Sequence, residues 1–352
     1  MKILLIVVLA IIVFDFAFSL YFLKQTFKKF NMVTDSISPS VPFDYYDGVS
    51  REELTFLSGK NHLKATLLTA SDSGAIPNKN EAKGLIVFSH GIWSGPDEYL
   101  MLLTRLVKSG YLVFAYNYTA YNGSEGRWAK GLPGSRMDLD AALTYIENDT
   151  ALKKHKLFLL GHSWGAYATA SVLNMGHHID GAIALSGFNE PMEITMDSGS
   201  SMVGKIAYIM YPFIWIIERI MFGKNSNVKA TDAINSVDTP ILIVHGSGDD
   251  FIKVDKTAII AKKASITNRN VTYHEITEEN ACGHNDYIGA KEDGEYFLEC
   301  SREIQNLQKQ NGGSISSALR EKLNESYDYE KLSSINPKLL ELIVGYFDKL
   351  SK

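Results

Sequence analysis

The sequence around Ser163 has the residue types and spacing expected of a nucleophile. Ser163 stands in Gly161-His162-Ser163-Trp164-Gly165, after the apolar run 156–160 and before the Ala-rich stretch 166–175. The apolar run predicts a buried strand, and the Ala-rich stretch predicts a helix. A serine at such a strand-to-helix turn is the sequence form of a nucleophile elbow, whose tight backbone requires the two flanking glycines. Ser163 is therefore the candidate nucleophile.

A second glycine-bearing loop is a candidate for the oxyanion hole. The apolar run Gly84 to Ser89 leads into His90-Gly91-Ile92-Trp93-Ser94-Gly95. A glycine here allows a sharp turn that points a main-chain N–H into the space above the sheet. Acyl transfer needs preorganised donors for the developing negative oxygen, and we assign this role to the N–H groups of Ile92 and Trp164. The alternative is a plain strand-to-helix turn with an incidental His-Gly pair.

An acid follows another predicted strand. The run Pro240 to Val244 precedes His245-Gly246-Ser247-Gly248-Asp249-Asp250. A buried carboxylate at this place can orient a histidine and stabilise its imidazolium form. Asp249 is preferred to Asp250 because the apolar pattern resumes three residues after it, at Ile252. The alternative is a turn in which both acids are solvated.

The candidate base is His284, in the loop Cys282-Gly283-His284-Asn285-Asp286 after the strand-like run Val271 to Ile276. A lone histidine is more often structural than catalytic. Here it comes after the candidate nucleophile and acid in the chain order Ser, Asp, His, which favours a catalytic role.

The elements that must position these residues alternate along the chain between apolar runs and helix-like stretches. After a polar linker at about 31–50, this alternation predicts an α/β domain with a largely parallel sheet. Residues 53–56 and 63–69 read as an opening antiparallel pair, and Pro337 to Leu350 reads as a closing helix.

Composition excludes several functional classes. The net charge of -5 and the pI near 6.0 provide no basic surface for nucleic acid. The two cysteines, Cys282 and Cys300, form no disulfide framework, and no C-x-x-C pair points to a metal site. They either form a single bridge outside the cytoplasm or remain unpaired thiols. We expect no cofactor and no metal, because a triad and oxyanion N–H groups suffice for hydrolysis.

The N-terminus reads as a membrane anchor over residues 1–30, followed by the catalytic domain, 31–352. Ile3 to Leu23 is almost wholly apolar, and at about 1.5 Å per residue it reaches across a hydrocarbon layer of roughly 30 Å. The alternative is a signal peptide cleaved at Ala17-Phe18-Ser19, which would make the protein secreted. The anchor is preferred because apolar character resumes at Tyr21-Phe22-Leu23.

Together, the motifs around His90-Gly91, Ser163, Asp249 and His284 resemble those of the α/β-hydrolase superfamily, especially its serine-aminopeptidase-like and monoacylglycerol-lipase-like branch. The resemblance runs from about Glu52 to Asp286 and includes the final helix. It implies an α/β-hydrolase fold, a mostly parallel sheet flanked by helices. It also implies a triad in which Ser163 attacks a carbonyl, His284 acts as base and then acid, and Asp249 orients His284.

Two long segments depart from the common pattern. Family members place a lid where this chain has residues 189–238, and the centre of that segment is strongly apolar. We predict a helical lid over an acyl pocket, with Tyr208, Tyr211, Phe213 and Trp215 facing the substrate and Pro212 breaking or kinking the helix. The alternatives are a helix pair packed on the core and an interfacial membrane helix. Residues 287–335 read as a helical surface insertion.

The leading hypothesis is a membrane-associated serine hydrolase of carboxylic esters, with acyl esters or lysolipids as substrates. The apolar lid and the anchor motivate the lipid preference, whereas the triad motivates acyl transfer alone. A second hypothesis is an aminopeptidase or amidase that uses the same triad. A third is an inactive, membrane-tethered binding module.

Overall fold

A mixed β-sheet forms the centre of the molecule. The computed structural model describes residues 1–71 and 81–352. Within these residues, eight strands lie in the order β1-β2-β4-β3-β5-β6-β7-β8. β1 pairs antiparallel with β2, and β2 with β4, whereas the other pairs are parallel. The predicted α/β class is thus confirmed. The strands are β1 (Val49–Ser58), β2 (Asn61–Ala70), β3 (Leu85–Ser89), β4 (Leu112–Tyr116), β5 (Leu157–His162), β6 (Gly181–Leu185), β7 (Ile241–Gly246) and β8 (Val271–Ile276).

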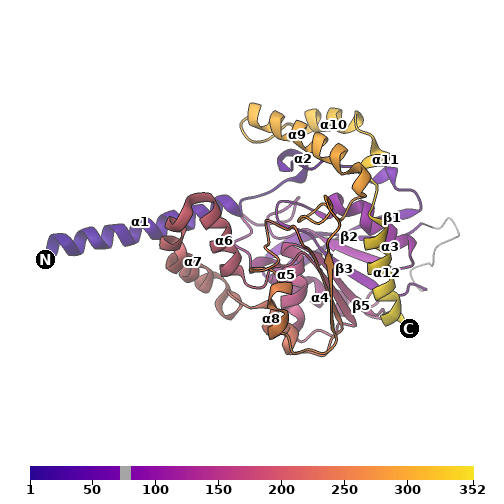
Figure 1. Ribbon diagram of the computed structural model, residues 1–352, viewed down its shortest axis with the longest axis horizontal. Coiled ribbons are helices and arrows are strands. Elements are labelled where there is room, and N and C mark those ends of the chain that lie inside the picture. The colour runs from indigo at the N-terminus through magenta and orange to yellow at the C-terminus, as the bar shows by residue number, and fades with distance from the viewer. Residues whose placement is uncertain (72–80) are drawn as a thin grey trace.

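Helices cover both faces of this sheet, which explains why its central strands are continuous apolar runs. In β3, Leu85 and Val87 face one layer of helices, while Ile86 and Phe88 face the other. The first layer holds α4 (Gly134–Asn148), α5 (Trp164–Ser171) and α8 (Ala230–Asn235). The second holds α3 (Leu100–Lys108) and α12 (Pro337–Ser351), as Figure 1 shows.

The sheet brings the candidate site residues to one edge. The carboxyl ends of parallel strands lie together, and loops that follow them share that edge. Ser163 follows β5, Ile92 follows β3, Asp249 follows β7 and His284 follows β8. Four segments far apart in the sequence therefore meet.

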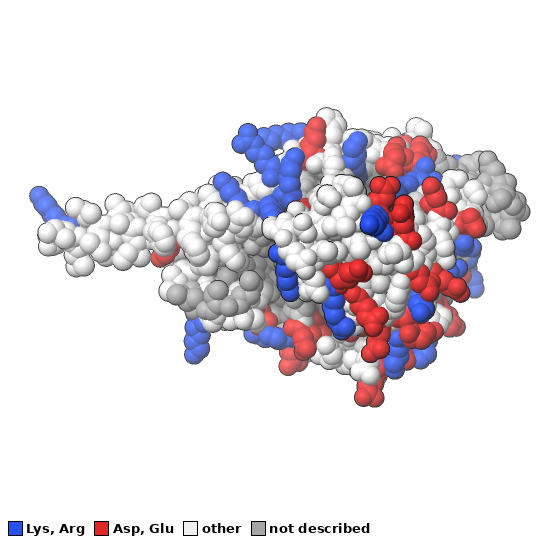
Figure 2. Space-filling model, turned by 90° about the horizontal axis from the view of Figure 1, so that it is seen from above, with Lys and Arg blue, Asp and Glu red and all other residues white. Residues whose placement is uncertain are grey.

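The N-terminal helix α1 (Lys2–Thr26) projects from the domain (Figure 1). It is long and apolar enough to cross a membrane. Its first part is exposed, and Figure 2 shows a protruding rod almost free of charged side chains. Its last part is different, because Ser19 and Leu23 are buried, and Phe27, which directly follows the helix, is buried too.

Three helices, α6 (Pro191–Val203), α7 (Ala207–Phe222) and α8, fill the segment predicted as a lid. Helix α7 lies against α1 (Figure 1). Between them, Phe16 packs edge-on against Phe213. Pro212 was predicted to break or kink this helix; a break is wrong, because α7 runs through Pro212, and a kink stays a prediction. Pro212 deprives the Tyr208 carbonyl of its helical N–H partner, and Tyr208 is exposed at the first turn, where solvent can reach that carbonyl.

The segment predicted as a surface insertion contains α9 (Gly294–Gln310), α10 (Ser317–Glu325) and α11 (Tyr329–Leu332). These helices pack with the linker that follows α1, which includes the short helix α2 (Met32–Asp35). Cys300 is buried in this small core, and neither it nor Cys282 forms a disulfide. Of the two expectations for the cysteines, unpaired thiols are confirmed.

Candidate active site

Ser163 lies on a sharp turn between β5 and α5. Its backbone has φ +56° and ψ −116°, a conformation that costs a non-glycine residue about 1–3 kcal/mol. The neighbouring glycines make the turn sterically feasible. A Cβ at Gly161 would clash with the Gly165 carbonyl, and one at Gly165 would clash with the Ser89 carbonyl. The predicted elbow geometry is present, and it explains both glycines.

A continuous chain of hydrogen bonds joins the three residues that the sequence singled out. His284 Nε2 lies 2.8 Å from Ser163 Oγ, and His284 Nδ1 lies 2.7 Å from Asp249 Oδ2. Because the ionised carboxylate only accepts, Nδ1 carries the proton and Nε2 accepts from the serine hydroxyl. This is the arrangement in which a histidine can take a proton from a serine.

Asp249 is the better placed of the two neighbouring acids. Its Oδ1 accepts hydrogen bonds from the main-chain N–H groups of Phe251 (3.0 Å) and Ile252 (2.8 Å), while Asp250 is exposed. Burial alone would raise the pKa of Asp249. The hydrogen bonds from His245 and His284, the charge of His284 and the Ile252 N–H outweigh it, so the pKa lies well below its usual range. Asp249 therefore remains a carboxylate in the folded protein.

Sequence reasoning missed His245 as part of this site. Its Nε2 lies 3.1 Å from Asp249 Oδ2 and 2.8 Å from the Ile252 carbonyl, so one N–H is shared between two acceptors. His245 precedes Asp249 by four residues across the turn after β7. The spacing His-Gly-x-x-Asp was a signal that this histidine could support the acid.

His162, the residue before the nucleophile, is a second contributor that the sequence did not identify. Its Nε2 donates to the His284 carbonyl (3.0 Å), which leaves Nδ1 to accept from the Tyr99 hydroxyl (2.9 Å). Tyr99 Oη in turn accepts from the Gly91 N–H at 3.3 Å. Burial, followed by the charge of His284, lowers the pKa of His162 to about 3. A neutral His162 thus ties the elbow to the loops of His284 and Gly91.

The predicted oxyanion loop lies directly beside the nucleophile. A Cβ built on Gly91 would be 3.6 Å from Ser163 Cβ, which is van der Waals contact, and 3.1 Å from the Tyr99 hydroxyl, which would be tight. Ile92 follows in the loop, and Trp164 is the first residue of α5. Their assignment as oxyanion donors stays a prediction, to which this proximity is favourable.

The four residues predicted to line a substrate lid are not brought together. Tyr208 and Tyr211 line a cavity of about 480 Å³ between α6 and α7, whereas Phe213 contacts α1 and Trp215 is exposed. Helix α7 is apolar around most of its circumference, so the sequence pattern did not define which side faces inward. The buried positions of α7 are Ala207, Ile214, Ile217 and Glu218.

The cavity beside α6 adjoins the loop that carries Asp249. Lys253 and Lys256 follow that acid, and both bind the carboxylate of Asp197 in α6, Lys253 at 2.7 Å. The other acids that line the cavity are also paired, Glu193 with Lys262 and Glu190 with Lys229. The α6 end of the predicted lid is therefore attached to the acid loop by ion pairs.

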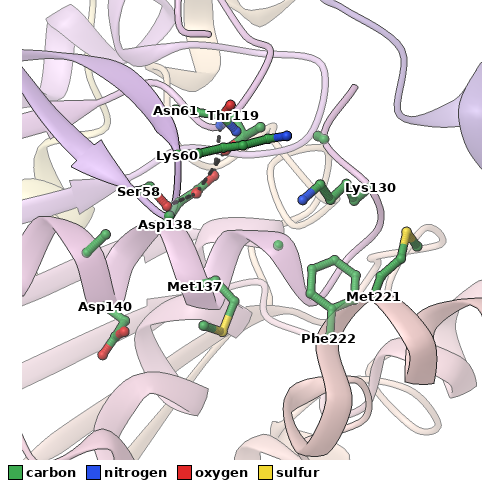
Figure 3. A pocket seen from close by; sticks show the side chains of 14 residues that line it. Ser58, Lys60, Asn61, Thr119, Lys130, Met137, Asp138, Asp140, Met221 and Phe222 are labelled. Carbon is green, nitrogen blue, oxygen red and sulfur yellow. Dashed lines mark hydrogen bonds between the residues drawn. The ribbon is translucent and has the colours of Figure 1, made fainter. Parts of the chain in front are cut away.

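A second cavity, of about 290 Å³, is a separate feature (Figure 3). It lies between the β1–β2 turn, α4 and the end of α7. Asp138 accepts hydrogen bonds there from Ser58 and Thr119, and Phe222 closes one side. None of the three hydrogen-bonded residues Ser163, Asp249 and His284 lines it. The candidate reactive centre is therefore identified by the hydrogen bonds among these three residues and not by this cavity.

Comparisons with known proteins bear on the family and the fold. Residues 80–230 match the family model described as serine aminopeptidase, S33, a segment that includes the elbow and the oxyanion loop. A comparison with curated proteins gives no match.

Among solved structures, the esterase Pf2001 of Pyrococcus furiosus superposes with a TM-score of 0.54 at 16% identity, covering 81% of this chain and 98% of its own. The uncomplexed acylaminoacyl peptidase of Pyrococcus horikoshii superposes with a TM-score of 0.51 at 15% identity, covering 82% of this chain and 45% of its own. At these identities the likeness shows a shared fold.

Proposed function

We propose that this chain, which has the α/β-hydrolase fold that its motifs predicted, is a serine hydrolase that cleaves carboxylic esters with an apolar acyl chain. The observation that carries the proposal is the hydrogen-bonded chain from Ser163 Oγ through the His284 imidazole to Asp249. All three residues are largely buried, so water competes little for these bonds.

In the proposed mechanism, Ser163 Oγ forms a bond to the ester carbonyl carbon while His284 Nε2 takes its proton. The electron pair of the carbonyl moves onto oxygen, and the N–H groups of Ile92 and Trp164 stabilise that charge. His284 then returns the proton to the leaving alcohol, which produces an acyl-enzyme. Water activated by His284 releases the acid.

The apolar surface of α7 supports an acyl substrate. This helix exposes large apolar side chains beside α1, itself exposed and apolar, and together they form a continuous apolar surface. Surfaces of this kind mark contacts with membranes or apolar ligands. The large apolar residues that α7 exposes are Tyr208, Ile209, Tyr211, Trp215, Ile216 and Ile220.

Retention of α1 as an anchor is part of the proposal. Cleavage at the signal-peptidase site considered above, Ala17-Phe18-Ser19, would remove Phe16 and Ser19 from the mature chain. In the structure, Phe16 packs on α7 and Ser19 is fully buried. Cleavage there would remove contacts to the lid helix. The intact mass of the protein from cell membranes is expected to include residues 1–19. A mature chain that starts at Leu20 would contradict the anchor.

A fluorophosphonate probe and a substrate panel test the reaction. The probe should label the full-length protein at Ser163, as mapped by peptide mass spectrometry, and Ser163→Ala should lose both label and activity. We expect kcat to fall by on the order of 10⁴-fold or more in that variant, with its thermal unfolding unchanged. An unlabelled, folded wild-type protein would rule the proposal out.

The panel separates ester from amide chemistry. p-Nitrophenyl esters from acetate to palmitate should be hydrolysed, with KM falling as the chain lengthens. Turnover of aminoacyl anilides alone would favour the aminopeptidase hypothesis. One observation disfavours it: the carboxylates that line the cavity beside α6 are engaged by lysines and are not free to bind a substrate amine.

A further inference from the structure

The last residue of α1 and the segment that follows it lie against the loop that carries the candidate oxyanion donor Ile92. This segment, residues 26–36, joins the anchor to the catalytic domain, and the loop comprises Gly91 to Gly95. Three sets of contacts connect the two. They hold the part of the loop that follows Ile92, at Trp93, Ser94 and Gly95.

The first set fixes the residue immediately after Ile92. The indole N–H of Trp93 donates to the carbonyl of Thr26, the last residue of α1, at 3.1 Å. Trp93 has φ +55°, an unfavourable value for a tryptophan, so an external partner is needed to retain the conformation. Next to Thr26, the buried ring of Phe27 packs against Trp164, with 5.9 Å between ring centroids. Thr26 and Phe27 thus contact Trp93, which follows Ile92, and Trp164, the second candidate oxyanion donor.

The second set runs through Asn122. Its Oδ1 accepts from the Met32 N–H at 2.7 Å, and its Nδ2 donates to the Ser94 carbonyl at 3.2 Å. Its own N–H donates to the Phe30 carbonyl at 2.8 Å. A Cβ at Gly95 would clash with Nδ2, so the loop approaches Asn122 as closely as a glycine permits. Asn122 therefore connects the N-terminal segment to the far side of the loop.

The third set runs through Glu98. Its two carboxylate oxygens accept from the hydroxyls of Ser36 and Ser94, the latter at 2.7 Å. The guanidinium of Arg320, in α10, donates to the Ser36 carbonyl at 2.9 Å and so secures the segment from outside. The helical insertion therefore stabilises residues 26–36, which in turn hold the loop of Ile92.

We propose that residues 26–36 are a working part of the active site, and that Trp93 and Asn122 are positioning residues that hold the Ile92 N–H on the developing oxyanion. This inference rests on the proposed function, because it concerns the acyl-transfer transition state. Bond formation between Ser163 Oγ and the carbonyl carbon moves an electron pair onto the carbonyl oxygen. A displaced loop lowers the rate of that step without weakening binding of the uncharged ester.

The anchor is then coupled to the chemistry. Thr26 is both the last residue of the membrane-spanning candidate and the partner of Trp93. A shift of α1 relative to the domain therefore acts on Trp93, the residue next to Ile92, through the hydrogen bond between Trp93 and Thr26.

The test uses the full-length protein and two variants, Asn122→Asp and Trp93→Phe. Aspartate tolerates the positive φ of residue 122 and keeps the acceptor for Met32, but it lacks the amide donor, which bonds both the Ser94 carbonyl and Asn117 Oδ1. Phenylalanine keeps an aromatic ring and lacks the indole N–H. Asn235→Asp is the matched control, because Asn235 also bridges two main-chain groups, Ser265 O and Thr267 N, but at the far side of α8.

We measure kcat and KM on a short ester, the Ki of a trifluoromethyl ketone that forms an oxyanion on Ser163, and the unfolding temperature. In each test variant, kcat should fall about tenfold and Ki rise by a similar factor, with KM within about twofold of wild type. The control should change only the unfolding temperature.

Two results would overturn the inference. If both test variants keep kcat and Ki within twofold of the control, the contacts are merely structural, although the proposed function stands. If the wild-type protein neither hydrolyses esters nor reacts with the fluorophosphonate, the proposed function fails, and this inference fails with it.

Discussion

The fold has opposite effects on two buried carboxyl groups, Asp249 in the proposed catalytic centre and Glu218 in α7, the central helix of the predicted lid. Asp249 accepts two main-chain N–H bonds and contacts two histidines, so its pKa is lowered despite its burial. Among the described residues, neither carboxylate oxygen of Glu218 has a hydrogen-bond partner, and burial raises its pKa to about 8. The surroundings of Asp249 stabilise the charged carboxylate, whereas the surroundings of Glu218 favour the neutral acid.

The difference indicates that the two regions have different roles. A centre with partnered polar groups keeps one geometry, as transition-state stabilisation requires. A helix with an unpartnered buried acid and exposed aromatic residues is less firmly fixed to its present position. We therefore expect substitutions in the centre to change kcat, and substitutions in α7 to change stability and substrate preference.

The largest effect is expected from Asp249→Asn. The amide cannot carry the charge that stabilises the His284 imidazolium, and it allows the wrong imidazole tautomer. We expect kcat on a short ester to fall about 10³- to 10⁴-fold, with KM little changed. Asp250→Asn is the control, since Asp250 is exposed. Equal losses in the two variants would contradict the assignment of Asp249.

An intermediate effect is expected from Glu218→Gln. With its pKa raised from 4.5 to about 8, Glu218 binds a proton in the folded protein that the unfolded chain releases. The free energy of unfolding therefore falls as pH rises between these values, by a few kcal/mol at about 1.4 kcal/mol per pKa unit. Above about pH 8, this loss is complete.

Glutamine removes this pH dependence. The unfolding temperature of the wild type should drop more between pH 5 and pH 9 than that of Glu218→Gln. The exposed Glu325→Gln should behave like the wild type. Parallel curves for wild type and Glu218→Gln would mean that the buried acid is not held neutral.

The smallest effect is expected from Trp215→Ser on the exposed side of α7. Loss of this apolar surface should raise KM for a palmitoyl ester about three- to tenfold and leave the acetyl ester unaffected. Leu298→Ser, an equally exposed apolar residue of α9, serves as the control. A matching change with the acetyl ester would show that Trp215 acts on the centre and not on chain-length preference.

Much of the reactive centre could be predicted because its signals are local. Each of Ser163, Asp249 and His284 comes shortly after an apolar run, and the structure joins them by hydrogen bonds of 2.7 and 2.8 Å. The supporting residues Tyr99, His162 and His245 were not predicted as contributors. Their roles depend on contacts between loops, which residue spacing does not show.

The lid was the less predictable region. The length and apolarity of α7 are visible in the sequence, but a helix that is apolar on most sides has no pattern that selects its buried face. The structure decides this by packing α7 against α1, so that Phe213 meets Phe16 while Trp215 remains exposed.

By itself, the sequence determined the α/β class, the order of the reactive residues and an apolar N-terminal helix, because strand and turn patterns depend on neighbours in the chain. Only the tertiary structure decided that the end of this helix packs against the α/β domain. The bonds of Thr26 to Trp93 and of Met32 to Asn122 span large sequence separations. Such contacts arise only when the sheet, the linker and the helical insertion are packed together.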